Sequence, residues 1–122
     1  MNTMFGVVLL VFLGGGLGSA CRFGMSVLWA NNGATLPWAT IAANTVASLI
    51  LGMLWSARER GTLPLNCWFF AAAGFCGGFS TFSTYSLETF QLFRVGNPQL
   101  AFLNVAINTC VTLMMTFIGS RV

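Results

Sequence analysis

Residues 74–85 read GFCGGFSTFSTY, which places the adjacent glycines Gly77 and Gly78, followed by several hydroxyl side chains, inside a long apolar stretch. The stretch covers residues 65–93 and holds a single charged residue, Glu88. One continuous helix of this length would reach about 43 Å, whereas the hydrocarbon core of a bilayer is about 30 Å thick. Lipid offers no partners to freed backbone groups, so a break at this depth must lie against protein or a water-filled cavity. The sequence therefore predicts a helix broken near Gly77 and Gly78, a feature that marks ion or substrate sites in transporters.

The composition excludes an ordinary soluble domain. Of the 122 residues, 57% are hydrophobic and 6% are charged, against about 25% charged residues in a typical soluble domain. Four apolar segments approach or exceed the roughly 20 residues that a membrane-spanning helix needs, at residues 4–21, 38–57, 65–93 and 99–119. We therefore expect an all-α membrane protein with four transmembrane helices, folded as one domain over residues 1–122.

The formal net charge of +3 comes from scattered arginines, and no basic patch exists that could bind nucleic acid. With four spans, Arg58, Arg60 and Arg121 lie on one side of the membrane. Arg94 lies on the other side, together with Arg22 at the end of the first helix. So small a difference orients a chain only weakly. We therefore predict that two copies insert in opposite directions and form an antiparallel, dual-topology homodimer.

The last apolar segment carries a polar stripe. Its members recur every four residues and form one winding line about 18 Å long: Asn104, Asn108, Thr112 and Thr116. Such side chains commonly join membrane helices by hydrogen bonds, which explains the stripe without transport. Next to a broken helix, the same stripe also fits an ion path.

Further candidates lie in the other spans. Asn44 is the only amide in the second segment, and its carboxamide could solvate an ion or pair with another helix. Arg22 could set a positive potential at a pore mouth or extend to the headgroups. Glu88 is an acid in a span and is therefore a functional candidate. Phe82 and Tyr85, three residues apart, share a helix face, so their rings either pack or direct two positive edges at a small anion.

With these residues in view, the sequence resembles the fluoride channel family, the Fluc or CrcB proteins. The resemblance covers nearly the whole chain and rests on GGLGSACRF at 15–23, NTVASLILG at 44–52 and, above all, GFCGGFSTFSTY at 74–85 followed by Glu88. It implies a homodimer in the bacterial inner (cytoplasmic) membrane that crosses the bilayer several times. It also implies passive export of fluoride through two pores along the subunit interface.

The resemblance also implies a role for individual residues. The backbone carbonyls of Gly77 and Ser80 would hold one structural Na⁺ at the dimer centre, shared by both subunits. The implied fluoride pore consists of Phe82, Tyr85, Asn44, Ser83, Thr84, Asn104, Asn108, Thr112 and Thr116. Arg22 would be a vestibule arginine, and Glu88 the acid below the break. The sequence departs from the family at Tyr85, where a second Phe is usual, and at Ala47, where Gly is usual.

The main alternative is a small multidrug transporter that exports cations in exchange for protons. Such an exporter needs a carboxylate in the membrane, and Glu88 is the one acid that could serve. A subunit or assembly factor without transport activity would leave the break and the polar stripe unexplained. An enzyme is not expected, because the chain has no His, no pair of acids and no activated nucleophile.

Overall fold

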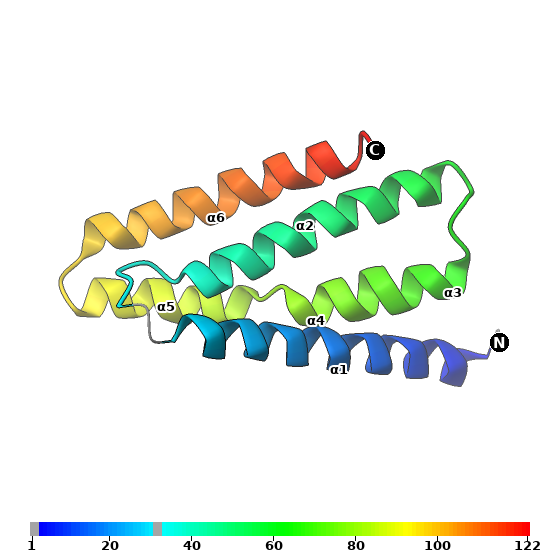
Figure 1. The fold of residues 1–122 in the computed structure, drawn as a ribbon, viewed down its shortest axis with the longest axis horizontal. Helices are drawn as coiled ribbons and strands as arrows, with labels where there is room; N and C mark the ends of the chain where they lie inside the picture. The colour runs from blue at the N-terminus through cyan, green and yellow to red at the C-terminus, as the bar shows by residue number, and fades with distance from the viewer. Residues whose placement is uncertain (1–2, 31–32) are drawn as a thin grey trace.

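The computed structural model describes residues 3–30 and 33–122, and every regular element in these ranges is helical (Figure 1). The elements are α1 (Met4–Trp29), α2 (Trp38–Glu59), α3 (Leu65–Trp68), the π-helix η1 (Phe69–Cys76), α4 (Gly77–Phe79), α5 (Phe82–Arg94) and α6 (Pro98–Gly119). By length and composition, α1, α2 and α6 could each cross a membrane. The predicted all-α fold is therefore confirmed, with three candidate membrane spans, and the third apolar segment is divided among four short elements.

The helical segments run back and forth along one long axis, so that both ends of the chain lie at the same end of the molecule (Figure 1). In this view α1 lies beside the series from α3 to α5, and α2 lies between that series and α6. The site described below forms where α2, α5 and α6 come together at the interruption between α4 and α5.

Glycine lets α1 pack directly on the backbone of η1 and α4. A Cβ atom added to Gly18 would lie 2.2 Å from the carbonyl oxygen of Phe75, and one added to Gly78 would lie 2.3 Å from that of Gly15. Gly14 and Gly18 are four residues apart, a spacing of small residues that is typical of such close helix contacts. The backbones on the two sides touch without intervening side chains.

A second glycine contact joins α2 to α6. A Cβ atom on Gly52 would lie 2.3 Å from the Thr116 carbonyl oxygen, and one on Gly119 would lie 2.3 Å from that of Leu49. Such close backbone approach is typical of tightly associated membrane helices. It fixes the spacing of the two helices that carry most of the polar residues.

Replacing Gly18 with valine should destabilise the protein. The new Cβ would overlap a backbone carbonyl that cannot rotate away, and overpacking of this kind costs about 1–3 kcal/mol. Gly16 provides the matched control, because a Cβ there meets nothing within 4 Å. Thermal denaturation in detergent should give a lower melting temperature for Gly18→Val than for Gly16→Val. Equal melting temperatures would contradict the packing described here.

The predicted interruption is present, and it begins about three residues after Gly77 and Gly78. Both glycines lie in helix α4, and the backbone becomes extended at Ser80 (ψ 156°) and Thr81 (φ −151°, ψ 123°). Gly78 remains helical and packs against the backbone of α1 at Gly15. The chain breaks where Thr81 begins a new helix, since its Oγ1 accepts a hydrogen bond from the Thr84 amide at 3.2 Å.

The predicted end of the first helix is wrong. Helix α1 passes through Arg22 and continues to Trp29. The Arg22 Nε donates to the carbonyl oxygen of Gly78 at 3.3 Å, and Ser19 Oγ approaches the same oxygen at 3.4 Å. Because this carbonyl provides a partner inside the fold, the arginine does not have to mark a helix end at the membrane surface.

Residues Phe69–Cys76 form a π-helix where an ordinary α-helix was expected. Most π-helical segments are single-turn bulges, and they occur frequently near functional sites. Here the segment leads directly into α4 and the interruption.

Candidate functional site

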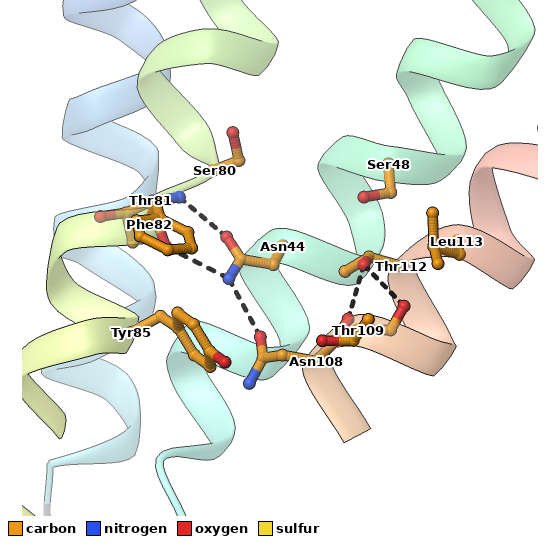
Figure 2. A pocket seen from close by; sticks show the side chains of 10 residues that line it. All are labelled: Asn44, Ser48, Ser80, Thr81, Phe82, Tyr85, Asn108, Thr109, Thr112 and Leu113. Carbon is orange, nitrogen blue, oxygen red and sulfur yellow. Dashed lines mark hydrogen bonds between the residues drawn. The ribbon is translucent and has the colours of Figure 1, made fainter. Parts of the chain in front are cut away.

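A groove with a volume of about 360 Å³ lies at the interruption and is open to the surface of the chain (Figure 2). Its lining comes from α2 (Asn44, Ser48), from the extended residues (Ser80, Thr81), from α5 (Phe82, Tyr85) and from α6 (Asn108, Thr109, Thr112, Leu113). The groove thus brings together several of the residues singled out in the sequence, from three separate segments of the chain.

Asn44 holds the interruption in place. Its Oδ1 accepts a hydrogen bond from the Thr81 amide at 2.8 Å, and its Nδ2 donates to the Thr81 carbonyl at 3.3 Å (Figure 2). The same Nδ2 donates to Asn108 Oδ1 at 3.0 Å. The carboxamide therefore replaces the helical partners of Thr81 and ties α2 to α6.

The backbone carbonyls of Gly77 and Ser80 are among those that lose their helical donors at the interruption. In a continuous helix the Thr81 amide would donate to the Gly77 carbonyl, and the Thr84 amide would donate to the Ser80 carbonyl. Instead, these amides donate to Asn44 Oδ1 and to Thr81 Oγ1. The two carbonyls are those that the family resemblance implies as Na⁺ ligands. Carbonyls at a helix C-terminus carry partial negative charge, which favours cations.

The polar stripe on α6 continues the network that begins at Asn44. Asn108 Nδ2 donates to Asn104 Oδ1 at 2.9 Å, and Asn104 Nδ2 donates to Thr89 Oγ1 at 2.9 Å. Thr89 Oγ1 then donates to the carbonyl of Tyr85 at 2.8 Å. Every donor along this series is oriented in the same direction. The series returns to α5 one turn beyond the interruption.

The members of the stripe therefore have different surroundings. Asn104 is 0% exposed and lies inside the network, away from the groove. Asn108 and Thr112 line the groove, and the hydroxyl of Thr112 donates to the Asn108 carbonyl. Thr116 does not line the groove, and its hydroxyl donates to the Thr112 carbonyl at 3.0 Å. The structure thus combines both interpretations of the stripe, with helix association at Asn104 and groove lining at Asn108 and Thr112.

The aromatic pair of α5 forms one wall of the groove. The ring centroids of Phe82 and Tyr85 lie 5.5 Å apart with an interplanar angle of 55°. Both residues line the groove, and Phe82 is 80% exposed. The predicted shared face is therefore present. Ser83 and Thr84, on the same helix, do not line the groove.

The two charged candidates lie outside the groove. Arg22 is half-buried against the carbonyl of Gly78. Glu88 Oε1 accepts a hydrogen bond from Thr40 Oγ1 at 2.8 Å. The other carboxyl oxygen, Oε2, is buried without a hydrogen-bond partner in the described part of the chain. Glu88 also lines two smaller hollows beside the connection from α1 to α2.

Four groove residues were not among the sequence candidates: Ser48, Thr81, Thr109 and the apolar Leu113. Ser48 follows Asn44 by four residues, so helical periodicity alone would have placed it on the same face of α2. Thr109 directly follows Asn108. Thr81 lies within the segment expected to break, but its backbone role depends on a residue from a distant part of the chain.

Comparison with known proteins identifies relatives along most of the chain. Residues 9–120 match the family described as CrcB-like protein, Camphor Resistance (CrcB). A protein of Pyrococcus abyssi named fluoride-specific ion channel FluC is 43% identical over 112 residues, which cover 91% of this chain and 90% of that protein. Proteins of the same name from Thermococcus gammatolerans and Parabacteroides distasonis are 43% and 35% identical, and the matches cover 93% and 92% of this chain and 92% and 88% of theirs. The predicted resemblance is confirmed, and the chain belongs to the CrcB family of membrane proteins.

Proposed function

We propose that the protein is a fluoride-selective channel that exports fluoride passively across the cytoplasmic membrane, with the groove at the interruption as part of its path. The observation that carries this proposal is the groove itself, where the rings of Phe82 and Tyr85 lie next to hydroxyl and amide groups from α2 and α6. The names of the relatives, which are fluoride-specific ion channels, support the same function. Passive flow through a channel involves no enzymatic step.

The chemistry of the groove suits a small anion that is strongly hydrated. Fluoride enters a narrow path only where other donors replace its water, since an uncompensated charge is costly to bury. Hydroxyl groups can supply such donors, and the positive edges of Phe82 and Tyr85 can stabilise the anion without a full charge. A cationic or acidic residue in the groove would bind one kind of ion too tightly or exclude it. The groove lining contains neither.

The proposed channel contains two copies of the chain in opposite orientations, each crossing the membrane four times, with residues 65–94 as the broken span. Phe82 is largely exposed beside a polar groove, an arrangement that a second copy would cover. Arg22 lies within α1 and is not counted with either side of the membrane. One side then carries three arginines, Arg58, Arg60 and Arg121, and the other carries one, Arg94, a difference of two (three minus one). So small an excess is compatible with insertion in both directions.

The antiparallel dimer predicts that C-terminal tags occur on both sides of the membrane. A tag readable by an impermeant label should be modified in about half of the molecules in intact spheroplasts, and in all of them after lysis. Labelling of all tags, or of none, before lysis would contradict dual topology.

The proposed channel holds a structural Na⁺ between the two copies, with the carbonyls of Gly77 and Ser80 from each copy as ligands. These oxygens fit the ion, because Na⁺ is a hard cation that binds oxygen ligands and both carbonyls have lost their helical donors. Once bound, the ion would compensate the negative ends of these peptide dipoles and favour anions nearby.

Removal of sodium should therefore lower the stability of the protein. We expect a lower melting temperature in N-methylglucamine chloride than in sodium chloride of equal ionic strength, and a return to the original value when sodium is added. An identical melting temperature in the two salts would contradict the proposed structural Na⁺.

A flux measurement with a controlled pH gradient separates this function from the alternative, in which Glu88 couples cation export to protons. In liposomes that contain the purified protein, fluoride efflux should proceed at the same rate with and without a pH gradient once the membrane potential is clamped. Cation efflux that requires a proton gradient, with no fluoride flux, would favour the multidrug transporter instead.

A further inference from the structure

Three polar residues that line the groove donate their hydrogen bonds to other parts of the chain: Asn44, Asn108 and Thr112. Both protons of the Asn44 carboxamide are directed to Thr81 and Asn108. The carboxamide of Asn108 donates to the backbone and side chain of Asn104. The hydroxyl of Thr112 donates to the Asn108 carbonyl. In this structure the protons of these groups are directed at acceptors of the chain itself.

A second set of donors in the groove is not engaged. The hydroxyl groups of Ser48 and Thr109 line the groove and form no hydrogen bond with any described residue. In helices Ser and Thr hydroxyls commonly donate to a carbonyl one turn back, as Thr45 does to Ile41 at 2.6 Å. Ser48 and Thr109 do not, and their protons remain available.

The two free hydroxyls lie on the wall opposite the aromatic pair. Figure 2 shows Ser48 on α2 and Thr109 on α6, on the far side of Asn44 from Phe82. The two helices are held in contact nearby, because Gly52 of α2 packs on the backbone of α6. Both hydroxyls are therefore carried on a rigid wall, while each can still rotate about its own C–O bond.

We propose that the hydroxyls of Ser48 and Thr109 bind fluoride directly as it passes the interruption and contribute to its selection over chloride. This inference rests on the proposed function. An anion in the groove would have aromatic edges on one side and these two O–H donors on the other. Fluoride is the smaller ion and the stronger acceptor, so it gains more from two short O–H contacts than chloride does. The Asn44 network then positions the site.

Variants that remove only the hydroxyl groups test this role. Ser48→Ala and Thr109→Val, alone and combined, should slow fluoride efflux from liposomes, and the double variant should be slower by about tenfold or more, since each lost bond is to a charged ion. The conservative variants Ser48→Thr and Thr109→Ser should remain clearly faster than their alanine and valine counterparts. The ratio of fluoride to chloride flux should fall in the double variant.

Thr45→Val is the matched control, because this hydroxyl donates to its own helix and lies outside the groove. Its efflux should equal that of the wild type. Gel filtration checks the assembly of each protein. If Ser48→Ala fails to assemble, Ser48→Cys preserves the shape with a weaker donor and should be slow for the same reason.

Wild-type efflux and selectivity in an assembled double variant would overturn the inference and leave the proposed function intact. A wild-type protein that carries no fluoride would overturn the proposed function, and this inference with it. Equal losses in the conservative and the hydroxyl-free variants would assign Ser48 and Thr109 to packing and would also overturn the inference.

Discussion

Replacement of Phe82 with isoleucine should abolish fluoride efflux from liposomes while the protein still assembles. The ring is 80% exposed in the single chain, so it contributes little to the packing within one subunit. Isoleucine retains a bulky apolar side chain but has no ring edge with positive partial charge. We expect at least about a 100-fold loss of rate, which corresponds to about 2.7 kcal/mol in the barrier.

Phe12 provides the control for this prediction, since it is 73% exposed on α1 and lies outside the groove. Phe12→Ile should pass fluoride at the rate of the wild type. Gel filtration should give the same elution volume for both variants and the wild type. A Phe82→Ile protein with normal efflux would remove this ring from the permeation path.

Replacement of Asn44 with leucine should have an effect of similar size through a different cause. The change removes the hydrogen bonds to the amide and carbonyl of Thr81 and to Asn108. Hydrogen bonds in membrane proteins contribute about 0.6–1 kcal/mol each, so we expect a loss of about 2 kcal/mol in stability. Fluoride efflux should fall to the background rate, because the freed Thr81 backbone no longer holds the groove in shape.

Asn66→Leu is the matched control, because Asn66 is exposed near the start of the third segment and far along the sequence from the groove. It should leave the melting temperature and the efflux rate unchanged. An Asn44→Leu protein with wild-type efflux would show that the interruption does not depend on this carboxamide, contrary to our account.

The sequence predicted an interrupted third segment but placed the interruption too early. The break was expected near Gly77 and Gly78 because the segment is too long for one straight span. Gly78 instead serves close packing against α1. The extended backbone begins at Ser80 and Thr81, where the side chain of Asn44 replaces the helical partners. Asn44 is separated from Thr81 by 37 residues, so no local pattern could locate the break.

A similar distinction applies to the polar candidates. The four-residue spacing correctly grouped Asn104, Asn108 and Thr112 on one side of α6. Periodicity predicts which side of a helix a residue lies on, but not what packs against that side. It therefore could not show that Asn104 is fully buried while Thr112 lines the groove. Arg22 was expected at a helix end because charge usually marks one. Its contact with the carbonyl of Gly78 depends on how α1 packs against α4.

The most direct test of the central claim, that the groove at the interrupted helix carries fluoride, is to record fluoride and chloride efflux side by side from the same liposomes. The purified protein should release trapped fluoride rapidly once the membrane potential is dissipated, while chloride remains inside at the level of protein-free vesicles. Release of chloride as readily as fluoride, or no release of fluoride at all, would contradict the account.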